Sequence, residues 1–237
     1  PGAEELDLRT LPTPDADGGY EVSEPAAPGS NNFAVAGART ADGRAIVAGD
    51  MHLGLRAPNI WFRARLTYPD ARAPGGQVDI GGFTLPGIPA VIVGSNGHVA
   101  WSFTNSYGDW LDFYKVEWAN ADRSRYRVPG GQQALRVATE WIAVKGASPV
   151  ELKVRETRWG PITGELDDTT SLALRWTAQL PGALNFDLAN LAYAPDLDSA
   201  LAVADLAGIP AQNLVIGDRA GRIAWRLTAQ MPERSGN

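Results

Sequence analysis

The chain has 237 residues, of which 44% are hydrophobic, and this is enough for one large domain with a sizeable core. It carries 21 lysines and arginines against 27 aspartates and glutamates, a formal net charge of -6, and no cysteine. Disulfide scaffolds, thiolate metal sites and cysteine nucleophiles are therefore excluded, and no apolar run approaches the roughly 18 residues that a membrane span needs.

The negative charge lies in the first 29 residues. Arg9 is the only basic residue there, and the acidic ones are Glu4, Glu5, Asp7, Asp15, Asp17, Glu21 and Glu24. Proline and glycine are frequent in this segment and large apolar side chains are few, so we predict a spacer or linker over 1–29 and a folded domain over 30–237. The rest of the chain is charge-balanced, without a basic stripe, and this disfavours a nucleic-acid partner.

After residue 30 the pattern of apolar residues predicts strands. Apolar and polar side chains alternate over 61–66, 150–155 and 172–176, which indicates strands with one buried and one solvated face. The apolar runs 45–48 and 90–93 predict strands covered on both faces. Asn96-Gly97 lies between two apolar segments and predicts a two-residue hairpin turn with positive φ at both positions.

The segment 198–207 is the one that favours a helix, with Asp196 or Asp198 available as its N-cap. Two segments, SNGHVAW at 95–101 and DRAGRIAW at 218–225, share a turn followed by Gly-x-Val/Ile-Ala-Trp. Two such copies do not match a propeller period of about 40–50 residues, so we favour two similar hairpins in one sheet. The predicted fold is mainly β with a minority of helix.

The strongest chemical signal is Gly29-Ser30-Asn31-Asn32, at the end of the spacer. A cut before Ser30 would place a hydroxyl and a free α-amine on one residue. An α-amine has a pKa of about 7.7–8.0 and can act as a general base near neutral pH. Gly29 would allow the strained backbone in which the hydroxyl attacks the preceding carbonyl. Since the sequence is continuous through this bond, we expect the uncut chain to be inactive.

Several segments in the same chain resemble the penicillin acylase family of N-terminal nucleophile hydrolases. In order, they are GSNN at 29–32, DMHL at 50–53, PNIW at 58–61, GFTLPGIP at 82–89, GSNG at 94–97, Ala100-Trp101, Thr104, GDWLD at 108–112, and a block from Asn213 to Pro232-Glu233-Arg234. The resemblance spans 29–234. It implies an α+β fold that is a fragment of the αββα four-layer sandwich, mainly antiparallel β. We expect apolar surface to be exposed where neighbouring segments of such a sandwich would lie.

The resemblance also implies roles for individual residues. Ser30 matches the nucleophile. His52 falls where lactone-cleaving and glutaryl-type members have a histidine that orients or tunes the nucleophile's amine, whereas penicillin G members have glutamine. The oxyanion donors would be the Asn213 side-chain amide and the Asn105 backbone N–H, each worth about 2.7–4 kcal/mol. The Asn105 side chain departs from the small residue common there. On spacing alone, His52 would be an ordinary loop histidine and Asn213 a turn residue.

A calcium loop and an arginine complete the implied site. Asp109, the Leu111 carbonyl and Asp112 fit the family's calcium loop, with further oxygens needed from distant segments because Ca²⁺ takes 6–8 ligands. Asp218 is one candidate for these. Arg234 matches an arginine near the active site that could orient a substrate carboxylate or the surroundings of the nucleophile.

The implied function is hydrolysis of an amide bond through an acyl-enzyme on Ser30, once self-cleavage at Gly29–Ser30 frees its amine. Substrates would be N-acylated small molecules: a β-lactam, an acyl-homoserine lactone or an acylated lipopeptide. His52 favours lactone or glutaryl-type substrates over penicillin G. The resemblance implies an α chain from the same precursor as partner, a structural calcium without organic cofactor, and a periplasmic or secreted location.

Two other classes of function stay open at this point. An inactive relative could serve as a binding or structural module. An unrelated β-rich binding domain, propeller-like or carbohydrate-binding, could use some of the eight tryptophans as stacking platforms. A row of exposed indoles would favour the binding domain, and buried ones would favour a sandwich.

Overall fold

The main element of the fold is a six-stranded antiparallel sheet. A computed structural model describes residues 29–53 and 57–234, and in it the strands follow the order β15-β14-β6-β5-β4-β3. The strands are β3 (Phe62–Pro69), β4 (Gln77–Thr84), β5 (Val93–Ser95), β6 (Val99–Asn105), β14 (Gln212–Asp218) and β15 (Ile223–Leu227). Because β6 and β14 pair antiparallel, with Gln212 opposite Asn105, residues that are distant in the sequence meet at one end of this sheet.

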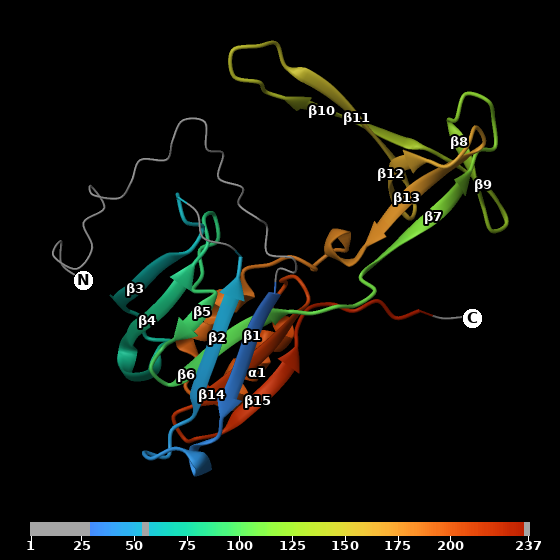
Figure 1. Cartoon of the computed structure of the whole chain (residues 1–237). Helices are drawn as coiled ribbons and strands as arrows, with labels where there is room; N and C mark the ends of the chain where they lie inside the picture. The colour runs from blue at the N-terminus through green and yellow to red at the C-terminus, as the bar shows by residue number, and fades with distance from the viewer. Residues whose placement is uncertain (1–28, 54–56, 235–237) are drawn as a thin grey trace, which may run out of the picture.

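A separate hairpin covers one face of the six-stranded sheet. It consists of β1 (Gly29–Val35) and β2 (Ile46–His52), connected through a short 3-10 segment, η2 (Gly37–Arg39). It lies across β6 and β14 (Figure 1). The approach is close: a Cβ on Gly49 would lie 1.8 Å from Ser102 Oγ, so only glycine fits there. The Asn32 amide fastens the hairpin by donating to the Ser102 and Asn213 carbonyls at 3.3 and 3.1 Å.

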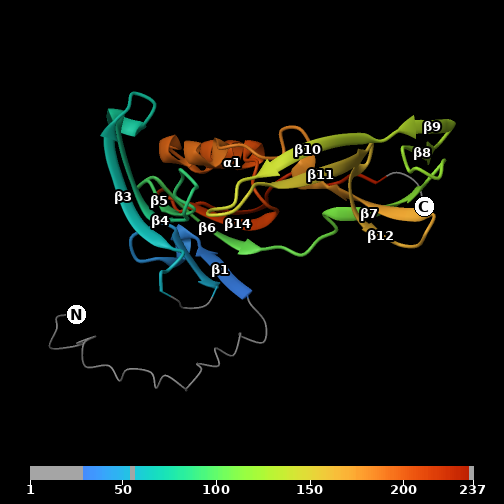
Figure 2. The same cartoon turned by 90° about the horizontal axis from the view of Figure 1, so that it is seen from above.

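Helical segments cover the opposite face of the sheet. Helix α1 (Leu197–Leu206) and the 3-10 segment η5 (Asp187–Tyr193) lie on the side away from β1 (Figure 2). The core between them and the sheet contains apolar side chains from both layers, including Trp101, Leu191, Ala200, Leu214 and Ile216. The layers are therefore hairpin, sheet and helix, which confirms the predicted α+β class and matches part of a four-layer sandwich.

A second antiparallel sheet extends away from the first (Figure 1). Its order is β10-β11-β12-β13-β7, and a two-stranded ribbon, β8–β9, lies beside it. The bounds are β7 (Leu111–Glu117), β8 (Arg125–Val128), β9 (Gly131–Ala134), β10 (Arg136–Ile142), β11 (Val150–Thr157), β12 (Gly160–Glu165) and β13 (Thr170–Trp176), and the remaining 3-10 segments are η3 (Pro74–Gly76) and η4 (Thr177–Gln179). Val116, Tyr126 and Ala173 form a small core of its own.

Several strand predictions named the right segments but the wrong buried face. In β13 the buried residues are Ser171 and Ala173, whereas the larger Leu172 and Leu174 are only half-buried. Ser171 Oγ donates to Glu165 and accepts from the Trp118 indole, so the polar side chain is satisfied inside. The reason is that Tyr126 and Trp159 pack on that face of the strand, and alternation alone does not say which face is covered.

Other predicted apolar faces are exposed in the described part of the chain. Phe62 in β3 is 70% exposed, Ile46 at the start of β2 is 53% exposed, and Val150 and Leu152 in β11 are also open to solvent. The prediction that 45–48 is covered on both faces is therefore wrong for Ile46, since the β1–β2 hairpin has the six-stranded sheet on one side only. These exposed side chains agree with the expectation of open apolar surface.

The turn at Asn96-Gly97 differs from the predicted two-residue type. Gly97 has φ +80°, but Asn96 does not have a positive φ, and the loop between β5 and β6 has three residues. The buried Asn96 amide donates to the carbonyls of Leu191 and Ala194, and its oxygen accepts the N–H groups of His98 and Val99. The Asn96 side chain thus connects the turn to the helical layer. A prediction from the local turn type does not include such a tertiary contact.

The helix and repeat predictions are confirmed. Asp196 is the N-cap of α1 and accepts the Ser199 N–H at 2.9 Å. The two similar segments are the β5–β6 and β14–β15 hairpins of one sheet. Trp101 is buried, while the exposed Trp141, Trp176 and Trp225 are divided between two sheets and form no single row. Among the described residues, no helix is long and apolar enough to cross a membrane.

Candidate active site

Ser30 lies at the start of β1, half-buried, at the end of the sheet where β6 terminates. Its side chain faces β6, because the alternation of the strand directs Ser30 and Asn32 towards the sheet and Asn31 away from it. The backbone N–H of Asn105, the last residue of β6, donates to Ser30 Oγ at 3.2 Å. The structure therefore brings the predicted nucleophile and one predicted oxyanion donor into contact.

Asn213, on β14, binds the backbone of the same residue, Asn105. Its Nδ2 donates to the Asn105 carbonyl at 3.0 Å, and its Oδ1 accepts the Trp225 indole N–H at 3.1 Å. Since an indole N–H can only donate, the Trp225 contact fixes which atom of the Asn213 amide is the oxygen. The NH₂ group has two hydrogens, of which one is donated to the Asn105 carbonyl and the other has no acceptor among the described residues. Trp225 therefore orients the Asn213 amide, and the sequence motifs did not indicate this role.

The side chain of Asn105 turns towards β14. Its Oδ1 accepts the Gln212 Nε2 at 3.1 Å, which forms an amide bridge across the ends of β6 and β14. The bridge belongs to the rim of a cavity that Ser30 also lines. The Asn105 side chain is thus part of the cavity lining, while its backbone N–H donates to Ser30 Oγ.

The cavity beside Ser30 has a volume of about 540 Å³ and is mainly apolar. Its apolar lining is Met51, Leu53, Trp61, Leu85, Ile88, Ala90, Ile92, Val93, Phe103, Leu184, Phe186, Leu188, Ile209 and Pro210. Its polar side chains are Asn185, which is bound to Leu206 and Gly208, and the group Ser30, Thr104, Asn105 and Gln212. An apolar cavity with a hydroxyl and convergent amide groups at its edge is the arrangement expected for binding an acyl chain with its carbonyl at the polar end.

His52 does not lie beside the hydroxyl of Ser30. The register of the hairpin pairs Ser30 with Met51 and Gly29 with His52, so the imidazole projects from the outer face of the hairpin. A Cβ added to Gly29 would lie 3.5 Å from His52 Nδ1. The ring is thus next to Gly29, the residue that precedes the predicted cleavage point. It lies on the face of the hairpin opposite to the Ser30 hydroxyl.

Asp50 accompanies His52 on that outer face, and the sequence motifs gave it no role. Its Oδ1 lies 3.1 Å from His52 Nε2 and accepts the Asn31 backbone N–H at 2.9 Å. The Asn31 N–H, first, and the His52 side chain, second, hold the pKa of Asp50 below its ordinary value of 3.8. The i, i+2 spacing of Asp50 and His52 on a strand was the available signal, because such residues share a face.

Arg234 is bound to the predicted calcium loop. Its guanidinium donates to the Asp109 carbonyl at 3.0 Å and lies 3.3 and 2.9 Å from the carboxylates of Asp109 and Asp112. Leu111 begins β7 between these residues. Asp218 is elsewhere, at the opposite end of β14 from Asn213, where it binds Arg222 and the Leu197 N–H. Burial acts to raise the pKa of Asp218, but these donors hold it below the ordinary value.

The described residues do not form a calcium site by themselves. No three acidic or histidine side chains among them are placed so that they could hold a metal ion, and the two loop carboxylates already face one guanidinium. A calcium ion would have to displace Arg234 and find further oxygen ligands. Calcium binding therefore has no support from the donor set that 29–53 and 57–234 provide.

We expect the replacement Arg234→Gln to have a small effect on stability and to create no response to calcium. All three side chains are more than a third exposed, so the ion pairs contribute at most about 1 kcal/mol to the free energy of unfolding. Because two carboxylates without further oxygen ligands do not make a calcium site, EDTA and added calcium should leave the urea midpoint unchanged in both the parent and Arg234→Gln. A calcium-dependent midpoint in the parent that Asp112→Asn abolishes would contradict this expectation.

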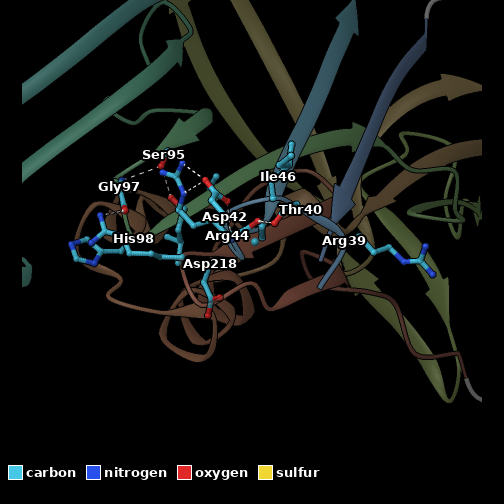
Figure 3. A pocket seen from close by; sticks show the side chains of 15 residues that line it. Arg39, Thr40, Asp42, Arg44, Ile46, Ser95, Gly97, His98 and Asp218 are labelled. Atoms are coloured by element: carbon cyan, nitrogen blue, oxygen red, sulfur yellow. Dashed lines mark hydrogen bonds and ion pairs between the residues drawn. The ribbon is translucent and has the colours of Figure 1, made fainter. Parts of the chain in front are cut away.

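A second cavity, of about 600 Å³, lies at the other end of the hairpin, near the β5–β6 turn (Figure 3). Its charged lining is largely satisfied within the chain. Arg44 Nε donates to Asp42 at 2.8 Å, Asp218 is held by Arg222, and Arg39 points away from the other labelled side chains. This cavity has none of the nucleophile and amide geometry found beside Ser30.

Comparison with known proteins shows the family of the chain. The family model described as penicillin amidase matches residues 2–237. The chain is 33% identical over 221 residues to the penicillin acylase 2 proenzyme of Pseudomonas sp. (strain SE83), covering 91% of this chain and 27% of the relative. It is 34% identical over 221 residues to the acyl-homoserine lactone acylase QuiP of Pseudomonas fluorescens (strain Pf0-1), covering 86% of this chain and 25% of the relative.

Among solved structures, a thermostable penicillin G acylase from Alcaligenes faecalis matches with a TM-score of 0.71 at 20% identity, covering 86% of this chain and 36% of that one. This likeness concerns the fold, the layered sheets described above. The chain belongs to the penicillin amidase family. It spans about a quarter of the length of the curated relatives that it matches.

Proposed function

We propose that this chain contributes the nucleophile and oxyanion site of an acylase that hydrolyses a linear amide bond after cutting itself at Gly29–Ser30. The observation that carries the proposal is the contact between the Asn105 N–H and Ser30 Oγ at the polar edge of an apolar cavity. The family membership and the acylase relatives support the same reaction class.

Self-cleavage would begin when Ser30 Oγ attacks the carbonyl carbon of Gly29. The C–N bond to Ser30 breaks, the hydroxyl proton goes to the departing nitrogen, and an ester joins Gly29 to Ser30 Oγ. Water then hydrolyses the ester, giving a carboxylate on Gly29 and a free α-amine on Ser30. While the peptide is intact this nitrogen cannot act as a base, so the uncut chain would not turn over substrate.

In the hydrolysis of substrate, the freed α-amine would accept the proton of Ser30 Oγ as the oxygen attacks the acyl carbon. The Asn105 N–H and the second N–H of Asn213 would stabilise the oxyanion. The protonated amine then donates to the leaving nitrogen, which releases the amine product and leaves an acyl ester on Ser30. Water, deprotonated by the same amine, cleaves the ester to the acid and regenerates the hydroxyl.

We propose an N-acylated small molecule with an apolar acyl chain as the substrate. The cavity beside Ser30 supplies apolar walls and a polar edge, which suits the aliphatic chain of an acyl-homoserine lactone or acylated lipopeptide better than a charged acyl group. The amine-side group would meet the bridge between Asn105 and Gln212 at the rim.

The remaining parts of the proposal concern the full-length protein. An α chain from the same precursor as partner and a periplasmic or secreted location rest on the family resemblance, and the word proenzyme in the name of one relative supports a precursor. No step requires calcium, which would need ligands beyond the described residues.

The proposal is tested by intact-mass analysis of the full-length gene product, followed by an assay with acyl p-nitroanilides. We expect two chains, one of which begins Ser-Asn-Asn-Phe, and release of p-nitroaniline by the cleaved form. A product that stays uncut for days at neutral pH, and releases none, would instead identify an inactive relative.

The acyl cavity can be tested by filling it. Ala90 lines its wall, so Ala90→Phe is expected to exclude long chains while leaving the oxyanion site intact. Each excluded methylene costs about 0.8 kcal/mol, and loss of several should reduce kcat/KM for an octanoyl anilide by roughly 10- to 100-fold.

The control for this experiment is the same substitution at an exposed turn. Ala121→Phe, outside both sheets, should leave the chain-length preference unchanged. The ratio of octanoyl to acetyl kcat/KM is the measurement. An equal loss for both anilides in Ala90→Phe would contradict the assignment of this cavity to the acyl chain.

A further inference from the structure

One carboxylate connects His52 to the backbone next to the proposed nucleophile. Asp50 Oδ1 lies 3.1 Å from His52 Nε2 and accepts the backbone N–H of Asn31 at 2.9 Å and the Asn31 amide at 3.3 Å. Asn31 directly follows Ser30. The same oxygen therefore restrains the histidine ring and the peptide on the carboxyl side of Ser30.

Two groups lie close to Nε2 of the imidazole: Asp50 Oδ1 at 3.1 Å and the Asn31 amide nitrogen at 3.4 Å. Because an ionised carboxylate only accepts hydrogen bonds, a hydrogen bond between Nε2 and the closer Asp50 oxygen requires the proton on Nε2. In the neutral ring Nδ1 is then an acceptor, and it lies 3.5 Å from where a Cβ on Gly29 would stand. Asp50 thus orients the imidazole so that its acceptor, Nδ1, faces Gly29, the residue that self-cleavage would separate from Ser30.

The opposite face of the hairpin holds the hydroxyl. Ser30 Oγ is turned towards the Asn105 N–H, so the amine and the hydroxyl of a freed Ser30 would be approached from different sides. Once Gly29 leaves, Nδ1 would face the new α-amine and accept one of its N–H groups. That hydrogen bond would orient the lone pair of the amine towards Oγ. The amine can accept the hydroxyl proton as a base only in this orientation.

We propose that Asp50 is a positioning residue, which fixes His52 in the tautomer and orientation that aligns the α-amine of Ser30. The inference rests on the proposed function. In this proposal His52 acts on the backbone nitrogen of Ser30 and not on its hydroxyl. Asp50, two residues before His52 on the same strand, is the carboxylate that orients the imidazole.

The experiment is a double-mutant cycle in the full-length gene product. The variants are Asp50→Asn, His52→Ala and the double variant. The control is Asp42→Asn, because Asp42 lies in the loop that connects β1 to β2, at the end of the hairpin away from Ser30, and binds Arg44. Asp50→Asn keeps a side-chain oxygen for the Asn31 N–H but loses the charge. Self-cleavage is followed by intact mass, and kcat and KM are measured with octanoyl p-nitroanilide.

We expect Asp50→Asn to lower kcat by about 10- to 100-fold, by analogy with the partners that orient metal-bound histidines, with little change in KM. In the His52→Ala background the same substitution should change kcat less than twofold. His52→Gln should recover part of the activity, because its amide N–H can donate to Asp50. Asp42→Asn should behave as the parent.

Two results would overturn the assignment of Asp50. If Asp50→Asn lowers kcat equally in the parent and in His52→Ala, Asp50 acts only through the Asn31 backbone. If it lowers kcat in neither, Asp50 has no positioning role. A parent that neither cleaves nor hydrolyses overturns the proposed function and this inference with it. A parent that does both, together with an unaffected Asp50→Asn, overturns only the inference.

Discussion

Replacing Ser30 by alanine should leave the full-length gene product as one uncut chain and lower amide hydrolysis by roughly 10⁴-fold or more. The physical reason is that a single hydroxyl serves both steps: it attacks Gly29 during cleavage and the acyl carbon during turnover. Alanine keeps the backbone of β1 and its pairing with Met51, so the loss would be chemical rather than structural. Intact mass and p-nitroaniline release measure the two effects.

The matched control is Ser102→Ala, on the neighbouring strand β6. Ser102 is buried against Gly49 and its hydroxyl has no hydrogen-bond partner among the described residues. Removing an unsatisfied buried hydroxyl should leave stability unchanged or slightly raised, with normal cleavage. Two chains from Ser30→Ala, or an uncut Ser102→Ala, would contradict the assignment of Ser30.

The meeting of Ser30, Asn105 and Asn213 was predicted through the family resemblance and not through periodicity. Ser30 and Asn105 are 75 residues apart, and nothing in the local pattern of either segment indicates that they touch. The order of several short motifs carried that information. The roles of these residues stay predictions, whereas their proximity is now a property of the fold.

The sequence was least informative about which face of a strand is covered. Alternation in 172–176 identified the strand β13, yet the buried face carries Ser171 and Ala173 because Tyr126 and Trp159 pack there. A period of two defines two faces and does not say what packs on either. The second sheet as a separate unit was missed for the same reason, since its small core depends on contacts between β7, β8 and β13.

The position of His52 shows a similar limit. Its spacing from Asp50 on one strand was visible, but its place on the outer face, opposite Gly29 and away from Ser30 Oγ, follows from the register of β1 with β2. A shift of that register by one residue would have placed it on the hydroxyl side. Register is set by tertiary contacts such as Gly49 against Ser102, which no single segment contains.

The second large effect is expected at Asn213. Asn213→Ala removes a side-chain donor from the proposed oxyanion site, and loss of one such donor lowers kcat by about 10²- to 10³-fold, or 2.7–4 kcal/mol. KM should change little, because the interaction would form only as charge develops on the oxygen. The measurement is kcat with octanoyl p-nitroanilide on the cleaved enzyme, with Gln230→Ala as a control outside the cavity lining.

Asn213 also ties β6 to β14 through the Asn105 carbonyl, so a structural role must be separated from a chemical one. If the amide only joined the strands, Asn213→Ala would lower the free energy of unfolding by about 1 kcal/mol and leave kcat near that of the parent. Asn213→Asp sharpens the distinction. Its carboxylate can still accept the Trp225 indole N–H, but it can donate to nothing and would repel an oxyanion. We therefore expect kcat to be at least as low in Asn213→Asp as in Asn213→Ala, and a more active aspartate variant would contradict the oxyanion role.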